Sequence, residues 1–457
     1  MRTHLIITLA AVLAIGMTSP WPVAGEETSV TEEILEILRS QHQITEEQYN
    51  DLRRKGEKEK KEARNTLRTY WKHGLHFETP DKQFRLKIGG RIQNDWAAIA
   101  PDGDVSDKFP KLGDPETGTE FRRARLFVSG TMYDHIDFKA QYDFAGGETK
   151  FKDVWLGMHG LPALQTVKVG HFKEAFSLEE LTSSKHITFM ERALPNVFAP
   201  SRNTGIAIEQ KAMGGRLRWA AGAFRDTGEF GNGFGGSSLY NVTGRLTGLP
   251  WVADDGRRLL HLGVSYSHKF RSDDVIRFRQ RPEAHLTSVR LIDTQSNTLV
   301  DEERVTKDLI ADGVDLINPE VALVFGPVSL QSEYMHAFVN AAGMSNPNFY
   351  GVYVLGSYFL TGENRNYDRS EAAFGRVTPK HNFFGNDGGW GAWEIAGRYS
   401  RVDLNDAGVS GGKLQDVTAG INWYLNPDVR VTFNYVFANL RSVGDTNIVE
   451  GRFQIAF

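Results

Sequence analysis

Closely spaced arginines are the residues of this sequence best suited to bind a ligand. They form two groups: Arg122, Arg123 and Arg125, and Arg277, Arg279 and Arg281. The planar guanidinium group matches phosphate oxygens through bidentate hydrogen bonds. On an extended strand, the three arginines of the second group share one face and lie about 7 Å apart. The chemistry they predict is reversible anion binding; for the second group, the alternative is an exposed basic loop that binds lipopolysaccharide phosphates.

Other patterns with possible chemistry lack the context that the chemistry requires. Gly408-Val409-Ser410-Gly411-Gly412 fits the nucleophile-elbow pattern, but no helical pattern follows it. Asp102, Asp104 and Asp107 have incomplete spacing for a calcium loop. The chain has no Cys and its 13 His include no HExxH pattern. We therefore expect no enzymatic activity, no metal site and no cofactor.

The composition limits the classes of protein that remain. The 457 residues include 53 Lys+Arg and 57 Asp+Glu, 46 Gly and 11% aromatics, with a mean hydropathy of −0.38. A chain this polar lacks the runs of about 20 apolar residues that membrane helices need. A net charge of −4 argues against nucleic-acid binding. The hydrophobic content of 40% argues against disorder.

The chain has three expected parts: a signal peptide over residues 1–25, a charged helical or coiled-coil segment over 26–75, and a β-domain over 76–457. Arg2 and the apolar stretch 5–17 are typical of a secretory signal, with a membrane anchor as the alternative. In the second part, Thr45 and Gln48 have the spacing of a capping box. This segment is either a trimeric periplasmic stalk or a solvated charged helix.

From about residue 84 onward, apolar residues recur at every second position, as in β-strands. On one face of the segment 429–437 lie Val429, Val431, Phe433, Tyr435 and Phe437. The opposite face is small or polar, which fits a transmembrane barrel with lipid outside and water inside. The last residues also alternate, because Phe453, Ile455 and Phe457 share a face. A C-terminal strand that ends on an aromatic residue looks like the assembly signal of bacterial outer-membrane barrels.

The number of expected strands is even, as in bacterial single-chain barrels. We expect sixteen, near 86–99, 121–133, 135–145, 151–159, 164–172, 204–211, 215–224, 239–251, 258–270, 317–326, 328–339, 348–360, 391–404, 413–425, 428–440 and 448–457. Short turns are expected at 133–135, 326–327 and 426–428. Long loops are expected at the other end, over 100–119, 271–316, 361–390 and 441–447. Sixteen strands leave a water-filled lumen.

Several motifs together resemble the phosphate-selective porin O and P family. They are Gly89-Gly90-Arg91-Ile92, Phe121-Arg122-Arg123-Ala124-Arg125, Phe151-Lys152-Asp153-Val154-Trp155, Val169-Gly170-His171-Phe172-Lys173, Leu178-Glu179-Glu180-Leu181-Thr182-Ser183-Ser184 and Arg277-Phe278-Arg279-Gln280-Arg281-Pro282. The resemblance implies an all-β, 16-stranded antiparallel outer-membrane barrel that assembles as a trimer. It also implies that a loop folds into the lumen, and the apolar-rich stretch 173–203 fits that constriction loop.

The resemblance also implies a narrow anion-binding site. The family has two adjacent arginines, an aspartate, and a lysine with two serines on the inserted loop. Matching residues here are Arg122 and Arg123, Asp143, and Ser183 with Ser184. The lysine position is Glu180, a charge reversal for which Lys185 could compensate. Strand parity places Arg123 and Arg125 in the lumen and Arg122 outward, unless a bulge intervenes or Arg122 lies above the lipid band.

The resemblance further implies a ladder of arginines that leads anions to this site, and Arg277, Arg279 and Arg281 match it. The predicted function is a passive outer-membrane porin for small anions, with phosphate or polyphosphate as the permeant. The alternatives are a general, cation- or sugar-conducting porin, an envelope tether, and a barrel-borne hydrolase without an identifiable catalytic cluster. Expected partners are small anions, outer-membrane lipid, lipopolysaccharide and two further copies of the chain, but no nucleic acid. The expected location is the bacterial outer membrane, with the N-terminal segment in the periplasm.

Overall fold

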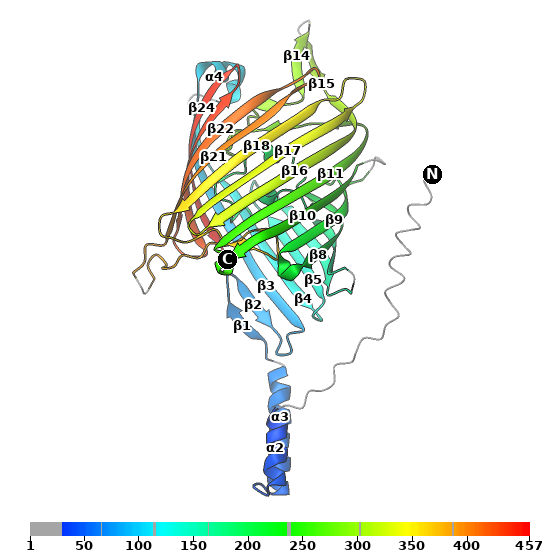
Figure 1. The fold of residues 1–457 in the computed structure, drawn as a ribbon, viewed down its shortest axis with the longest axis vertical. Coiled ribbons are helices and arrows are strands. Elements are labelled where there is room, and N and C mark those ends of the chain that lie inside the picture. The colour runs from blue at the N-terminus through cyan, green and yellow to red at the C-terminus, as the bar shows by residue number, and fades with distance from the viewer. Residues whose placement is uncertain are drawn as a thin grey trace, which may run out of the picture. The chain divides into compact units, whose positions relative to one another are not determined.

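The computed structural model describes residues 30–64, 66–112, 116–162, 164–234, 239–300, 303–385 and 388–457. The predicted signal peptide, residues 1–25, lies outside the described residues. The chain divides into two compact units, one that ends at residue 66 and one over Leu67–Phe457 (Figure 1). Among the described helices, none is both long and apolar enough to cross a bilayer.

The first unit is a pair of helices, α2 (Val30–Ser40) and α3 (Glu46–Arg64). The predicted capping interaction is present at the start of α3. The backbone N–H of Thr45 donates to Gln48 Oε1 (2.8 Å), and the N–H of Gln48 donates to Thr45 Oγ1 (3.2 Å). Arg39 of α2 forms an ion pair with Glu46 of α3 at 2.8 Å, so the two helices contact each other across their connection.

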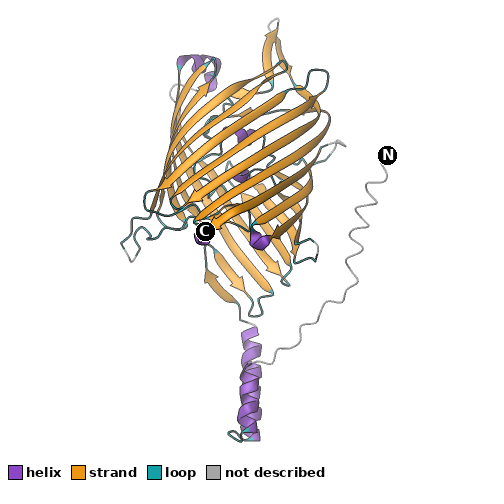
Figure 2. Cartoon of the chain, viewed as in Figure 1, coloured by secondary structure: helices purple, strands orange, loops and turns teal. Residues whose placement is uncertain are grey.

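The second unit is a closed antiparallel β-barrel of sixteen strands, as predicted (Figures 1 and 2). The strands are β3 (Phe84–Pro101), β4 (Glu116–Met132), β5 (Ile136–Asp143), β6 (Lys150–His159), β7 (Thr166–Lys173), β8 (Arg202–Ala212), β9 (Leu217–Arg225), β10 (Tyr240–Ala253), β11 (Arg258–Ile276), β16 (Leu309–Phe325), β17 (Val328–Ala341), β18 (Asn348–Phe359), β21 (Ala392–Asp406), β22 (Val409–Tyr424), β23 (Val429–Leu440) and β24 (Gly444–Ala456). Each pairs with the next, and β24 pairs with β3 to close the ring.

Shorter strands and helices precede the barrel strands or lie in the connections between them. The hairpin β1 (Arg68–Trp71) and β2 (Leu75–Glu78) extends the sheet beyond the start of β3. The connections contain β12 (Arg279–Gln280), β13 (Ile292–Asp293), β14 (Ser296–Val300), β15 (Glu303–Lys307), β19 (Tyr367–Asp368), β20 (Ala373–Phe374), α4 (Gly103–Lys108) and α5 (Leu178–Leu181). Four 3-10 turns cover Pro110–Leu112, Leu194–Val197, Met213–Gly215 and Asp254–Gly256.

The outward face of the barrel is apolar, and the inward face is polar over much of the strands. On β17, Leu330, Tyr334 and Phe338 are exposed, whereas the alternate positions Ser329, Gln331 and Glu333 are buried. A soluble barrel would show the reverse, because its apolar side chains would fill the core. This alternation therefore identifies the outer face as the surface that contacts lipid.

Aromatic side chains form a belt near each rim. At the rim that carries the chain's C-terminus, stacked pairs join Trp71 to Phe457, Trp251 to Phe325 and Trp393 to Trp423. The belt near the opposite rim contains exposed Tyr266, Phe270, Tyr334, Phe338, Tyr399 and Tyr435. Two such belts mark the membrane–water interfaces of an outer-membrane barrel.

We call the rim with Phe84 and Ala456 the turn end and the opposite rim the loop end. The predicted turns at 133–135, 326–327 and 426–428 all lie at the turn end. The connections between β3 and β4, between β11 and β16, and between β23 and β24 lie at the loop end, as predicted.

The segment 361–390 lies at the turn end, so its predicted placement among the loops of the other end is wrong. It connects the end of β18 to the start of β21. Since β17 leaves the turn at 326–327 and β18 returns to the same rim, whatever follows β18 must lie at the turn end. The prediction assigned long connections to the loop end and short ones to the turn end. Between β17 and β18 the loop-end connection is short, and the long connection that follows β18 lies at the turn end.

The outward position of Val354 on β18, 51% exposed, supports a depth-dependent stability prediction. Val354→Arg should lower the free energy of unfolding in lipid vesicles by about 2–4 kcal/mol, because it places a charge in hydrocarbon. Tyr358→Arg, on the same face of the same strand but within the turn-end belt, should cost about 0–1 kcal/mol. Urea titrations of both variants measure this difference. Equal costs at the two positions would contradict the assigned lipid face.

Candidate permeation path

A long loop between β7 and β8 folds into the barrel. We call residues 174–201 the constriction loop; it carries α5 and the 3-10 turn at Leu194–Val197. Its apolar side chains are fully buried: Phe176, Leu178, Phe189, Met190, Leu194 and Phe198. Short helical turns are visible inside the ring of strands (Figure 2). The loop that the sequence predicted between two strands is thus packed within the lumen.

Two further connections, neither of which the sequence pattern predicted, enter the lumen. The loop-end connection 277–308 buries Phe278, Leu291 and Ile292. The turn-end connection 360–391 contacts the constriction loop, since the backbone N–H of Phe374 donates to Thr182 Oγ1 at 3.3 Å. Apolar residues within both connections were the available signal for their burial.

Part of the lumen is filled by apolar side chains. Phe198 of the constriction loop packs against Phe278, with ring centroids 5.2 Å apart, and Phe278 packs against Phe349 of β18 at 5.8 Å. The same cluster includes inward side chains of β16, β17, β21, β22, β23 and β24 towards the loop end. This apolar core excludes water from the inner face of these strands at that level.

A cavity of about 1340 Å³ remains along the inner face of β3 to β10. Sixteen Lys or Arg side chains line it, against seven Asp or Glu. The cations are Arg85, Lys87, Arg91, Arg122, Arg123, Arg125, Lys139, Lys152, Lys168, Lys173, Lys185, Arg192, Arg202, Arg218, Arg245 and Arg376; the acids are Glu78, Asp137, Asp153, Glu180, Glu209, Asp368 and Glu371. The described lining therefore carries a large excess of basic side chains.

A β-bulge places the adjacent arginines on the same side of the wall. In the pairing of β3 with β4, Gln93 lies opposite Arg123, and the next residue of β3 lies opposite Phe121. Arg122 is thus the extra residue of the bulge and faces inward with Arg123, while Phe121 is exposed. Of the two explanations that strand parity allowed for Arg122, the bulge is correct.

The two arginines hold the constriction loop. Arg122 donates two hydrogen bonds to Glu191 (2.8 and 2.9 Å), and Arg123 lies 3.6 Å from the same carboxylate. Arg452 of β24 also reaches Glu191, at 2.9 Å. Burial alone would raise the pKa of Glu191, but these three guanidinium groups hold it well below its usual value. Glu191 therefore remains an anion and fixes the loop to the wall.

Asp143 lies next to the arginine pair but is not among the residues that line the cavity. Its carboxylate accepts a hydrogen bond from Arg125 Nε (2.6 Å) and one from the backbone N–H of Ala124 (3.1 Å). The expected aspartate thus orients Arg125, whose side chain does line the cavity.

Glu180, which replaces the lysine of the family pattern, is neutralised by two cations. Its carboxylate lies 3.1 Å from Lys173 Nζ and 3.1 Å from Arg192 Nε. Burial alone would raise the pKa of Glu180, but the charges of Arg192 and Lys173 lower it to about 2. Two basic side chains face this one carboxylate, so the charge reversal at this position does not make the site acidic.

Ser183, Ser184 and Lys185 lie together on the cavity wall. Arg91 Nη1 of β3 donates to Ser184 Oγ (2.7 Å) and to Ser183 Oγ (3.2 Å). Arg91 and Lys185 have no carboxylate at ion-pairing distance among the described residues. Burial and then the charges of Arg91, Arg376 and Lys87 lower the pKa of Lys185 to about 6. An anion beside Lys185 would therefore favour its protonated form.

The three arginines of the predicted ladder lie outside the described cavity lining. Arg277 is exposed and paired with Asp293 at 2.5 Å, Arg279 is exposed, and Arg281 donates to the backbone oxygen of His285 at 3.1 Å. They follow β11 on the loop-end connection, so the structure does not bring them together with the cavity cations. Lys87, Lys139, Lys152 and Lys168 line the cavity instead, and inward strand parity was the signal for most of them.

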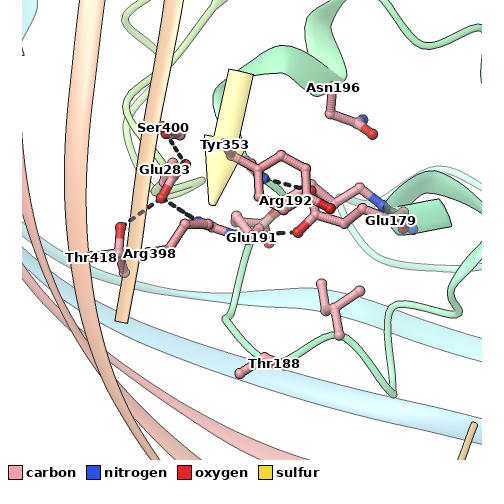
Figure 3. A network of polar contacts seen from close by, with 12 residues as sticks. Glu179, Thr188, Glu191, Arg192, Asn196, Glu283, Tyr353, Arg398, Ser400 and Thr418 are labelled. Carbon is pink, nitrogen blue, oxygen red and sulfur yellow. Dashed lines mark hydrogen bonds and ion pairs between the residues drawn. The ribbon is translucent and has the colours of Figure 1, made fainter. Parts of the chain in front are cut away.

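A buried network holds two of the inserted loops against the wall (Figure 3). Glu283 of the loop-end connection accepts hydrogen bonds from Arg398 Nε (2.9 Å), Ser400 Oγ (2.5 Å) and Thr418 Oγ1 (2.6 Å). Arg398 also lies 3.2 Å from Glu179 of the constriction loop. The two loops share Arg398, so neither is positioned independently of the other.

Comparisons with known proteins agree with this architecture. The sequence model of the phosphate-selective porin O and P family matches residues 86–457 of this chain. An uncharacterised protein of Caulobacter vibrioides is 31% identical over 376 residues, which is 80% of this chain and 70% of that protein. Porin O of Pseudomonas aeruginosa is 27% identical over 405 residues, covering 82% of this chain and 88% of that protein.

Two solved structures share the fold. An anion-selective porin from Comamonas acidovorans has a TM-score of 0.52 at 12% identity and covers 82% of this chain and all of its own. The trimer form of OmpT from Vibrio cholerae has a TM-score of 0.50 at 11% identity and covers 82% of this chain and 99% of its own. The chain belongs to the phosphate-selective porin O and P family and is an outer-membrane β-barrel porin.

Proposed function

We propose that this porin conducts small anions, with phosphate or polyphosphate as its preferred permeants. The observation that carries the proposal is the excess of basic over acidic side chains along the cavity. Low-dielectric walls strengthen the field of these charges and raise the local concentration of anions. The same field disfavours cations, which counts against the alternative of a general or cation-conducting porin. The family's name and an anion-selective porin of the same fold give independent support.

The binding step of this proposal takes place at Arg91, Ser183, Ser184 and Lys185. Guanidinium and hydroxyl donors can replace the water shell of a phosphate oxygen, and an anion held by several weak donors can still leave. Among the described residues, the side chain of Arg91 donates only to hydroxyl groups, so its remaining N–H groups are available to an anion. Passage is passive diffusion down a gradient.

The proposal extends to the assembly of the protein. We propose a homotrimer, because a porin of the same fold has been solved in a trimer form. Residues 26–75 would form a periplasmic segment, and its helical pair α2–α3 would contribute to the trimer contact. The exposed Arg277 and Arg279 at the loop end would face lipopolysaccharide phosphates.

Arg91→Gln tests the phosphate site. Added phosphate should block chloride current through the wild-type channel in a planar bilayer. In the variant, the half-blocking concentration should rise about 10-fold or more, because a charge-assisted hydrogen bond contributes about 1.5–3 kcal/mol. Arg257→Gln, an exposed position at the turn end, is the charge-matched control and should behave like the wild type. The proposal fails if phosphate leaves the wild-type chloride current unchanged.

The lowered pKa of Lys185 predicts pH-dependent selectivity. Below pH 6 the side chain is protonated, so the chloride-to-potassium permeability ratio should rise as pH falls from about 8 to about 5, with a midpoint near 6. Lys185→Arg should keep the high ratio throughout, because arginine stays protonated, and Lys185→Gln should keep the low one. Reversal potentials in a salt gradient measure all three proteins. Identical pH curves would show that Lys185 does not set the selectivity.

A further inference from the structure

Among the aromatic rings that line the cavity, two lie between lysines and keep part of their surface exposed, whereas Phe172, also near Lys168, is buried. Phe127 of β4 and Trp155 of β6 are both partly exposed, and both line the cavity. In an outer-membrane barrel, aromatic residues are expected on the lipid face and at the rims. Inorganic anions are strongly hydrated and gain nothing from an apolar ring. The position of these two rings therefore needs a reason beyond conduction of inorganic phosphate.

Glycines on the wall leave room for the rings. Gly89 of β3 lies directly opposite Phe127, and a Cβ atom at Gly89 would lie 2.6 Å from Phe127 Cζ. A Cβ atom at Gly157 of β6 would lie 3.2 Å from Trp155 Cζ3. Each ring thus covers a glycine along the wall instead of filling the middle of the cavity, which leaves part of its surface open to the lumen.

Lysines flank both rings. Lys87 Nζ and Lys139 Nζ lie 6.0 and 5.9 Å from the centre of the Phe127 ring. Lys168 Nζ lies 4.9 Å from the Trp155 ring centre, and Lys139 is directly opposite Trp155 in the pairing of β5 with β6. Rings and ammonium groups therefore alternate across five neighbouring strands, β3 to β7. We call Lys87, Phe127, Lys139, Trp155 and Lys168 the aromatic–lysine wall.

We propose that the aromatic–lysine wall binds organic anions that carry a flat aromatic group beside a phosphate- or phosphonate-like head. The ring of such a solute can stack on Trp155 or Phe127 while its head group contacts a neighbouring ammonium group. Stacking buries apolar surface of both partners. Lys139 and Lys168 are paired with Asp153 (2.6 Å) and Glu209 (2.9 Å), whereas Lys87 has no carboxylate at ion-pairing distance among the described residues and supplies the counter-charge. This inference rests on the proposed anion-channel function and names a class of solute within it.

A pair of solutes that differ only in the ring tests the proposal. Methylphosphonate and phenylphosphonate have the same head group, and each is added to wild-type channels that carry chloride current. Phenylphosphonate should block at an about fivefold lower concentration, the gain expected from one ring contact. In the double variant Phe127→Leu/Trp155→Leu, the ratio of the two half-blocking concentrations should fall to about one, while block by methylphosphonate stays unchanged. Leucine keeps the site apolar but removes the flat ring.

The control is Trp219→Leu on β9, where the side chain shares the outward face with its partner Leu246; its ratio should equal that of the wild type. A wild-type ratio of one, or a ratio retained in the double variant, would overturn the proposal. Absence of block by either phosphonate would instead overturn the anion site itself and this inference with it. A heat-dependent shift in gel mobility, measured for every variant, shows that the variant has folded into a barrel. If the double variant does not assemble, each single variant should lower the ratio.

Discussion

The permeation path depends on ion pairs between the acidic side chains of the constriction loop and the basic inner wall. Glu179 reaches Arg398, Glu180 reaches Lys173 and Arg192, and Glu191 reaches Arg122, Arg123 and Arg452. An isolated buried charge would be costly, so these pairs fix the loop. The surrounding cations also hold the pKa values of Glu180 and Glu191 below their usual range, so both carboxylates stay ionised. The pairs also decide which cations stay without an acidic partner. Arg91, Lys87 and Lys152 have none among the described residues. Lys185 also has none and becomes a cation below a pH of about 6, its pKa, and all four side chains line the cavity.

The same loops make the lumen asymmetric. Apolar contacts of Phe198 with Phe278, and of Phe278 with Phe349, fill the loop-end part of the lumen beside β16 to β24. The described cavity lies along the inner face of β3 to β10, where most of its basic side chains lie. In the proposed function, selectivity therefore arises from a few strands of the barrel, and the overall net charge of −4 carries no information about it.

The period-two pattern was sufficient to predict the strands, because a lipid-facing side chain leaves a local signal at every second residue. Strand parity placed Arg122 outward unless a β-bulge intervened, and the structure has that bulge. The ion-pair partners of Glu180 could not be predicted from this pattern. Lys173 and Arg192 lie 7 and 12 residues away in the sequence, and the fold of the constriction loop brings them to Glu180. The segment 361–390 and the arginines at 277–281 were misplaced for a related reason. Loop length and charge do not encode the side of the barrel or the direction in which a loop folds.

The most direct test of the central claim is the reversal potential of the wild-type channel in an about tenfold gradient of potassium chloride. If the unpaired cations of the cavity set selectivity, the potential must have the sign of a channel that prefers chloride, and higher salt must reduce its magnitude through screening. A reversal potential with the opposite sign, which means preference for potassium, would contradict the account.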